Sequence, residues 1–433
     1  MSKNMRRVTK NKVQKIQPQE IKQAFTLQLS DGTLDQPSIY NIMKPIIWGM
    51  VVFGIYHRDK RIEVRESADG NTEETSTRVR ISASISSTLI YNIIVSLLLC
   101  CGLLRIIICL SIGGVSTVVF VFEIVVLLWF FLCTVNGIIC LKFSHYRYGH
   151  SHVFYRHWEE MMANFGELKI EYNTRKLRRV FLVTFISSWF IIGFNIVGGA
   201  ILIFNPFGDG KEAMELALTS PFPATTSLKI GALIFHIYFS GVWILPAAYV
   251  LILNLAIKYG FLALCDAMDK EVRLSKDRLT DRLQDFRKVH LDLCRCIEIL
   301  DKDFNILNAC WYAVTISVTC LILYTLIHFG GDIFFNIMFI FWLLSGLGYV
   351  AVTSFFSASL HETVQGPLDA LLKTTTNEIT PEKQAQLNLF LAKLTVNNTG
   401  FTVLTLITIT KELLLTLTGL FLTYFFLLTQ FNI

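Results

Sequence analysis

Apolar residues in this chain gather into long blocks that polar, charged segments separate. Seven of these blocks are long enough to cross a hydrocarbon core of about 30 Å as helices. They cover residues 86–109, 114–141, 180–204, 228–256, 306–328, 333–359 and 409–431. A shorter run, 40–56, contains Lys44 and Pro45, so we predict an interfacial or re-entrant helix there. The pattern predicts an all-α, polytopic membrane protein with seven transmembrane helices.

The basic residues decide the predicted orientation. Of the 39 Lys and Arg residues, 36 fall in alternate segments between the spans. These segments are 1–85, 142–179, 257–305 and 360–411. Cytoplasmic loops carry the excess of Lys and Arg, so we expect the N-terminus in the cytoplasm and the C-terminus outside the cell. The first forty residues are polar and basic without an apolar core, so an internal span is expected to direct membrane insertion.

Two segments on the predicted cytoplasmic side have the pattern of amphipathic helices. One lies in 261–303, which lacks Gly and Pro, and the other begins at Thr380 and Pro381, an N-cap followed by proline at the first helical position. Their apolar positions recur at spacings of three and four: Leu279, Leu283, Phe286, Val289, Leu293, Ile297 and Leu300, then Leu387, Phe390, Leu391 and Leu394. Such stripes need partners, and a homo-oligomer could supply them.

The expected organisation follows from the spans and these helices. In chain order it consists of a cytoplasmic N-terminal region 1–85, spans one to four in 86–256 with the ligand-pocket region, a cytoplasmic helical extension 257–305, spans five and six in 306–359, cytoplasmic helices of an anchor bundle in 360–408, and a pore-lining last span 409–433.

Composition excludes several classes of function. Hydrophobic residues make up 53% of the chain and charged residues 17%, with a mean hydropathy of +0.52, which excludes an ordinary soluble domain. The net charge of +6 comes from the loops and therefore reflects topology rather than a nucleic-acid partner. The ten cysteines avoid the long external loop, so we expect free thiols.

Catalytic motifs and cofactor fingerprints are absent from the sequence, and we expect neither an enzyme nor a cofactor. Four histidines, His145, His150, His152 and His157, do cluster in one predicted cytoplasmic loop. Because aromatic residues rather than cysteines or carboxylates surround them, we interpret the loop as an aromatic, partly membrane-facing helix rather than a metal site.

The final span carries one polar line along an otherwise Leu- and Phe-rich helix. Its members follow at steps of four and three: Glu412, Thr416, Gly419, Thr423, Phe426 and Gln430. Polar groups in hydrocarbon are costly and normally face protein or water. The line therefore predicts either a pore-lining stripe, with Gln430 near the external mouth, or a contact surface between helices.

Residues 423–431 read Thr-Tyr-Phe-Phe-Leu-Leu-Thr-Gln-Phe, and this resembles the Thr-Tyr, five-residue spacer, Gln-Phe signature of insect gustatory receptors. Length, inverted topology and the long loop between the fourth and fifth spans are also similar to that family. The resemblance implies a homotetrameric or heterotetrameric ligand-gated cation channel in the plasma membrane of sensory cells, opened by a small-molecule tastant. It implies a pore lined by the last helix at Thr416, Thr423 and Phe426, with a gate near Gln430 and Phe431.

One residue departs from the sugar-sensing branch of that family. That branch typically has Glu after the motif's Tyr424, whereas this chain has Phe425. The departure argues against a sugar-branch receptor and leaves bitter-type, fructose-type or other ligands open.

The resemblance implies a ligand pocket within each subunit, in the outer half of the membrane domain. Uncommon polar and aromatic residues at that depth are Glu123, Asn195, His236, Tyr238, Asn336 and Trp342, with Trp189 and Trp243 as further stacking faces. Glu123 needs a partner among its Val and Phe neighbours, and His236 is one candidate. For each of these residues hydrogen bonding between helices is the alternative role.

Other classes of membrane protein remain as alternatives. A seven-helix receptor coupled to a cytoplasmic partner fits the span count but has the opposite orientation. A small-molecule transporter would show repeated halves with broken helices, for which Pro246, Gly346 and Gly348 are candidate breaks.

Overall fold

The apolar blocks fold as helices, since a backbone in hydrocarbon must satisfy its own hydrogen bonds. The computed structural model describes residues 38–57, 87–112, 117–145, 149–204, 222, 225–274, 282–328, 333–372, 380–395 and 399–430, all within the unit Pro37–Ile433. Its elements are α2 (Ile39–Val52), α3 (Ser87–Ile112), α4 (Thr117–Ser144), α5 (Ser151–Glu167), α6 (Thr174–Phe204), α8 (Thr226–Leu274), α9 (Leu283–His328), α10 (Ile333–Val364), α11 (Pro367–Leu372), α12 (Pro381–Thr395), β1 (Thr402–Val403), β2 (Ile407–Thr408) and α13 (Lys411–Gln430).

Each predicted span corresponds to a helix. Among the described residues six helices, α3, α4, α6, α8, α9 and α10, are long and apolar enough to cross a membrane. The seventh predicted span forms α13, which is not among these six but whose 20 residues reach about 30 Å at a rise of 1.5 Å per residue. The protein is an all-α polytopic membrane protein, as predicted.

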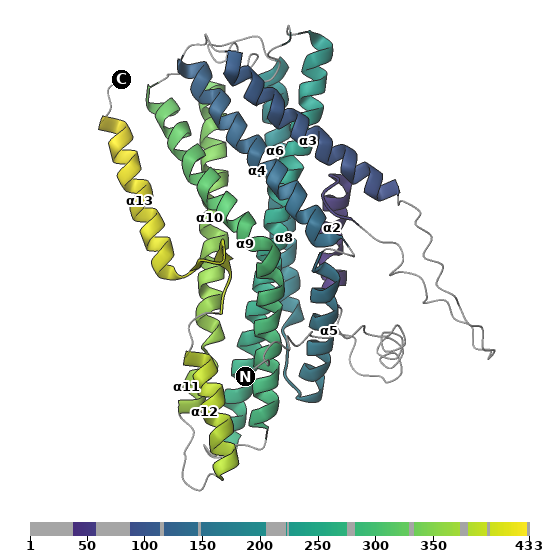
Figure 1. Ribbon diagram of the computed structural model, residues 1–433, viewed down its shortest axis with the longest axis vertical. Helices are drawn as coiled ribbons and strands as arrows, with labels where there is room; N and C mark the ends of the chain where they lie inside the picture. Colours follow the sequence, from purple (N-terminus) through teal and green to yellow (C-terminus); the bar gives the residue numbers. More distant parts are fainter. Residues whose placement is uncertain are drawn as a thin grey trace, which may run out of the picture. The chain divides into compact units, whose positions relative to one another are not determined.

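Helix α8 lies at the centre of the bundle. Every residue from Phe239 to Ile257 is buried, and α2, α4, α6, α9 and α10 pack around the helix. A helix that is apolar on all sides is expected inside a protein rather than at its surface. Figure 1 shows α8 between α9 and α2 at mid-height, while α13 lies at the edge of the bundle.

The long helices extend beyond their apolar blocks. α8 has 49 residues and continues through Pro246, and α9 has 46. α10 is likewise continuous through Gly346 and Gly348, so none of the three candidate breaks interrupts a helix. Thr380 accepts a hydrogen bond from the backbone N–H of Lys383, which confirms the predicted N-cap of α12.

The segment 40–56 is helical only up to Val52. Its helix α2 buries Met43, Ile46 and Met50 and packs on α8, α6 and α5. Gly241 of α8 permits this close approach, because a Cβ there would lie 2.4 Å from the ring of Phe53. Whether α2 is interfacial or re-entrant stays a prediction.

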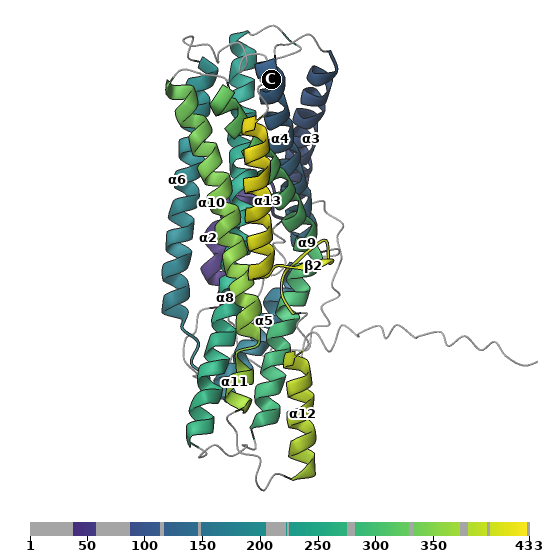
Figure 2. The same ribbon diagram turned by 90° about the vertical axis from the view of Figure 1, so that its left-hand side faces the viewer.

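A β-hairpin precedes α13, although we expected only helices in 360–408. Thr402 pairs with Thr408 and Val403 with Ile407. This stretch is rich in Val, Ile and Thr, whose branched side chains favour strands over helix. Figure 2 shows that α13 rises from this hairpin in front of α9 and α10, the two helices it packs against.

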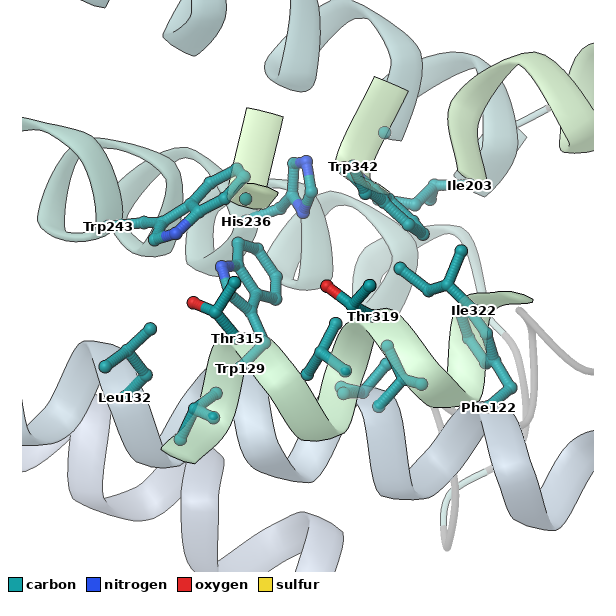
Figure 3. A pocket seen from close by; sticks show the side chains of 16 residues that line it. Phe122, Trp129, Leu132, Ile203, His236, Trp243, Thr315, Thr319, Ile322 and Trp342 are labelled. Atoms are coloured by element: carbon teal, nitrogen blue, oxygen red, sulfur yellow. The ribbon is translucent and has the colours of Figure 1, made fainter. Parts of the chain in front are cut away.

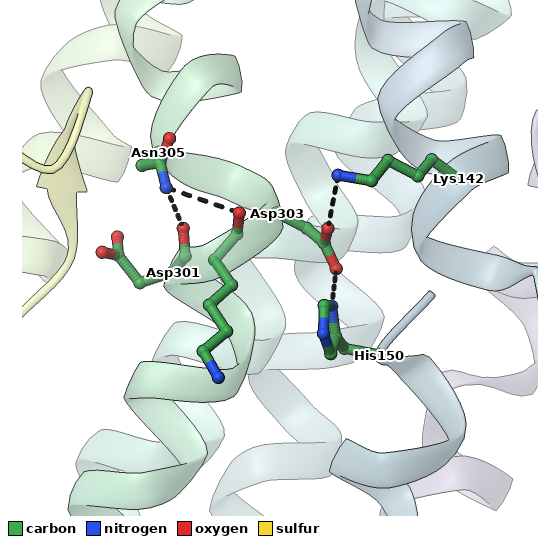
Figure 4. A network of polar contacts seen from close by, with 6 residues as sticks. Lys142, His150, Asp301, Asp303 and Asn305 are labelled. Carbon is green, nitrogen blue, oxygen red and sulfur yellow. Dashed lines mark hydrogen bonds and ion pairs between the residues drawn. The ribbon is translucent and has the colours of Figure 1, made fainter. Parts of the chain in front are cut away.

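Polar contacts on α9 fix the hairpin and the α4–α5 connection. Asp301 accepts hydrogen bonds from the backbone N–H and the hydroxyl of Thr402, each at 2.7 Å. Two residues later the buried carboxylate of Asp303 lies 3.4 Å from Lys142 Nζ and 2.7 Å from His150 Nδ1 (Figure 4). One turn of α9 therefore holds both the base of α13 and the end of α4.

Candidate functional site

A cavity of about 80 Å³ lies among α4, α6, α8, α9 and α10, and we call it the central cavity. Its lining contains no Asp, Glu, Lys or Arg. The lining residues are Phe122, Val125, Val126, Trp129, Leu132, Gly199, Ile203, His236, Trp243, Val314, Thr315, Val318, Thr319, Ile322, Trp342 and Gly346. The site suits an uncharged and mostly apolar molecule, because an unpaired charge would lose its hydration there.

Aromatic rings form much of the cavity wall. The ring of Trp129 lies 5.4 Å from that of His236 and 6.3 Å, edge to face, from that of Trp243. Figure 3 shows Trp129, Thr315 and Thr319 on one wall, facing Trp243, His236 and Trp342 on the other. Rings at these separations offer both faces and edges to a ligand.

A polar network holds in place the cavity wall that Trp243, His236 and Trp342 form. Asn195 of α6 accepts a hydrogen bond from Trp342 Nε1 at 2.8 Å and donates one to Ser240 Oγ at 2.7 Å. The backbone oxygen of Asn195 lies 2.9 Å from His236 Nε2, so this ring nitrogen carries the proton. Three residues predicted from the sequence, Asn195, His236 and Trp342, therefore meet at one place.

Gly199 allows α6 to pass close to the histidine of this network. A Cβ at position 199 would lie 2.2 Å from His236 Nε2, too close for any side chain without displacement of the imidazole. Small residues at helix interfaces permit this kind of approach in membrane proteins. Gly199 thereby sets the position of His236 in the cavity.

The other predicted ligand residues do not line the central cavity. Tyr238 lies against Tyr91, with 3.2 Å between the two hydroxyl oxygens, and Asn336 is half-buried near the start of α10. Glu123 is buried next to the lining residue Phe122, and its charged neighbour is Arg105 of α3. His236 is thus bonded to Asn195 and is not the partner of Glu123.

Of the two additional tryptophans, only Trp243 lines the cavity. Trp189 lies 6.3 Å from the ring of Phe53 and 6.2 Å from that of Phe185, on the side of α6 toward α2.

The predicted pore residues lie on the outward face of α13. Thr416, Thr423, Tyr424, Phe426 and Gln430 are all exposed. The opposite face, with Leu413, Leu414, Leu417, Phe421 and Phe425, is half-buried toward the bundle. The Thr416 and Thr423 hydroxyls donate to the carbonyls of Glu412 and Gly419, each at 2.9 Å. Phe431 lies outside the described residues.

Several lining residues were not singled out from the sequence. Thr315 and Thr319 stand four positions apart on α9, so they share one face of the helix. That spacing is the signal that could have identified them. Trp129 and Phe122 carry no such signal, because aromatic residues occur throughout these spans.

The histidine-rich loop has structural contacts in place of a metal site. His150 contacts Asp303, and His157 contacts the backbone oxygen of Asp292 at 3.1 Å. The predicted aromatic helix forms as α5, but its residues Phe154, Tyr155 and Trp158 are buried in the protein and do not face the membrane. Within the described residues no three His, Cys, Asp or Glu side chains are grouped to hold a metal ion, and all ten cysteines are free thiols.

Comparisons with known proteins give a consistent result. Residues 43–433 match the family model described as 7tm Chemosensory receptor. The fold is similar to the insect olfactory receptor OR5 from Machilis hrabei, with a TM-score of 0.63 and 15% sequence identity over 91% of this chain and 99% of that one. The complex of OR5 with eugenol gives a TM-score of 0.62 and 14% identity over the same shares. No curated protein sequence matches the chain.

Proposed function

The chain belongs to the 7tm chemosensory receptor family, and on that premise we propose that it is a ligand-gated, non-selective cation channel. A small molecule binds in the central cavity, and binding opens a pore that α13 lines together with copies of α13 from other subunits. The binding of eugenol by OR5, a protein of similar fold, supports a small-molecule ligand. The Thr423–Phe431 motif supports the gustatory branch and a tastant as the ligand.

The observation that carries the proposal is the position of the polar line on α13. Gly419 and Gln430 of this line are exposed on the face that points away from the bundle. An exposed amide such as that of Gln430 is costly against lipid, whereas water or a second protein surface satisfies it. A ring of subunits around an aqueous pore provides both, and we propose four subunits, identical or related.

Two helices connect the cavity to the proposed pore. α9 contributes Thr315 and Thr319 to the lining, α10 contributes Trp342, and α13 packs against both helices. A ligand that displaces α9 or α10 therefore moves a helix against which α13 packs. Binding opens the pore only to the extent that the ligand prefers the widened arrangement.

The proposed topology places the N-terminus in the cytoplasm and the C-terminus outside, in the plasma membrane of a sensory cell. Lys142, Lys258 and Lys411 then lie on the cytoplasmic side, as the bias of basic residues toward the cytoplasm requires. The ends of α8 and α9, with α11 and α12, form the proposed anchor between subunits. No cofactor enters the mechanism.

The test is whole-cell recording from cells that express the chain, during perfusion with sugars, alkaloids and other small tastants. We expect a reversible current that reverses near zero millivolts, as a non-selective cation conductance does. Gln430→Ala should change conductance or ion preference. Leu422→Ala, an exposed residue off the polar line, serves as the matched control.

Two outcomes would contradict the proposal. A Gln430→Ala variant with unchanged permeation and unchanged gating would exclude α13 as the pore lining. Stoichiometric uptake of the ligand without a current would indicate a transporter.

A further inference from the structure

Two threonines on the wall of the central cavity have no side-chain hydrogen bond to the described residues. Thr315 is 6% exposed and Thr319 is 2% exposed, and both line the cavity. The Thr315 methyl group accounts for the contact with Gly346 of α10, where a Cβ would lie 3.5 Å away, so the methyl rather than the hydroxyl fills that side. A buried hydroxyl without a partner costs free energy, and native proteins rarely leave one in that state.

Other hydroxyl residues of the same helix behave differently. Ser317 and Thr325 donate to the carbonyl groups four residues earlier, at 2.9 Å in each case. This back-bonding is the usual way for Ser and Thr to satisfy their hydroxyl in an apolar helix. Thr315 and Thr319 differ from these neighbours in their position on the cavity wall. Their hydroxyls are available to an occupant of the cavity.

A third polar group stands on the same wall. The buried indole Nε1 of Trp129 also has no partner within the described residues, and Trp129 stands beside Thr315 and Thr319 (Figure 3). An indole N–H can only donate a hydrogen bond, whereas a hydroxyl donates and accepts. One wall of a mostly apolar cavity thus carries three groups without partners among the described residues, two hydroxyls and one indole N–H, and all three can donate a hydrogen bond.

The size of the cavity constrains how a ligand fits. Its volume of about 80 Å³ is smaller than the ~150 Å³ cavity that admits benzene in an engineered protein interior. A ring-sized ligand therefore enters only if a wall moves. Movement of the Trp129 ring or of α9 would bring the indole N–H within reach of the ligand as well.

We propose that the central cavity selects an uncharged, ring-sized apolar molecule carrying one oxygen acceptor, which Thr315, Thr319 and Trp129 bind on the α4–α9 wall. The proposal rests on the function proposed above in one respect: it takes the central cavity as the ligand site. The oxygen accepts hydrogen bonds from the wall, and the rings of Trp243 and Trp342 cover the apolar body. A hydrocarbon of the same shape leaves the three groups unpaired and binds more weakly.

The experiment compares benzyl alcohol, benzaldehyde and toluene, which share a ring but differ in their oxygen. Binding to the purified full-length protein is measured by the dose-dependent rise in melting temperature, which requires no channel activity. We expect the two oxygen-bearing compounds to bind about three- to tenfold more tightly than toluene, the range of a neutral hydrogen bond.

Isosteric variants test the residues. Thr315→Val, Thr319→Val and the double variant remove hydroxyls with little change in shape, and should bring the ratio between benzyl alcohol and toluene to within about twofold. Thr325→Val is the matched control, because Thr325 donates to Leu321 and does not line the cavity. It should keep the wild-type ratio.

The outcomes separate this inference from the channel proposal. Equal binding of the three compounds, a ratio that survives in the double variant, or no binding by any of them would overturn the proposed selectivity. Selective binding without any current in cells would leave the selectivity standing and contradict the channel.

Discussion

Trp342 donates its indole N–H to the side-chain oxygen of Asn195 at 2.8 Å, across the gap between α10 and α6. The two residues are 147 positions apart in the chain, and the same Asn195 also accepts from His236 through its backbone. This bond connects Trp342, on the wall of the central cavity, to α6, a helix that faces the outside of the bundle. Loss of Asn195 would leave the indole N–H of the half-buried Trp342 without a partner.

Removal of either partner should therefore destabilise the protein, and the two effects should not add. We expect Asn195→Ala and Trp342→Phe each to lower the free energy of unfolding by about 1–3 kcal/mol. The double variant should lose less than the sum of the two, by at least about 0.5 kcal/mol. The departure from additivity is measured by thermal unfolding of the wild type, the two single variants and the double variant in the same detergent. Strict additivity would show that the hydrogen bond contributes nothing.

The two faces of α13 should differ in their access to water. A thiol at Thr423, on the exposed polar line, should react with a membrane-impermeant thiol reagent and change the ligand-evoked current. A thiol at Leu417, on the half-buried face toward α9 and α10, should not react. The wild-type protein, with its ten native cysteines, supplies the background. Equal modification at both positions would contradict a pore on the polar face.

Loss of the contact between the hairpin and α9 should lower the stability of the protein and change its gating by ligand. Asp301→Ala removes both hydrogen bonds to Thr402, and we expect a loss of about 1.5–3 kcal/mol because the acceptor is a carboxylate. The base of α13 then moves more freely, so ligand potency should change with it.

Asp285→Ala is the matched control for that variant, since it removes another carboxylate of α9 that lies at the start of the helix, away from the hairpin. It should leave both melting temperature and potency near the wild-type values. An Asp301→Ala variant with unaltered melting temperature would show that the hairpin does not depend on this contact.

His152 of α5 should make the protein less stable in mild acid. Burial, followed by the nearby charge of Arg156 and by His150, lowers the pKa of His152 below its ordinary value of about 6.5. The unfolded chain therefore binds the proton more readily than the folded protein does. The stability that neutral His152 provides is complete above about pH 6.5 and is lost as the pH falls toward its lower folded-state pKa.

The measurement compares melting temperatures at pH 7 and pH 5 for wild type and His152→Gln. The variant should lose less stability between the two values than the wild type. The two proteins share all other ionisable groups, so the difference between the proteins is the informative quantity. A variant with the same or a steeper pH dependence would contradict a lowered pKa of His152 in the folded protein.

The sequence determined the helices and their class, because the length of an apolar block and the absence of helix breakers act locally. It identified the seven helices that the spans form, the N-cap at Thr380 and the free thiols. It also identified Asn195, His236 and Trp342 as unusual residues, because a polar or indole group in an apolar helix always requires a partner.

Only the tertiary structure decided which of these residues share a site. Glu123 and Tyr238 are as conspicuous in the sequence as His236, yet they contact α3, since the rotation of each helix about its axis depends on packing against several neighbours at once. The spacing of Thr315 and Thr319 puts them on one face of α9, but only the structure shows that this face lines a cavity. The hairpin at 402–408 is hydrogen-bonded to Asp301, about a hundred residues away, and no local pattern carries that contact. Local chemistry sets what each segment forms, whereas shared burial between distant segments sets what the site can bind.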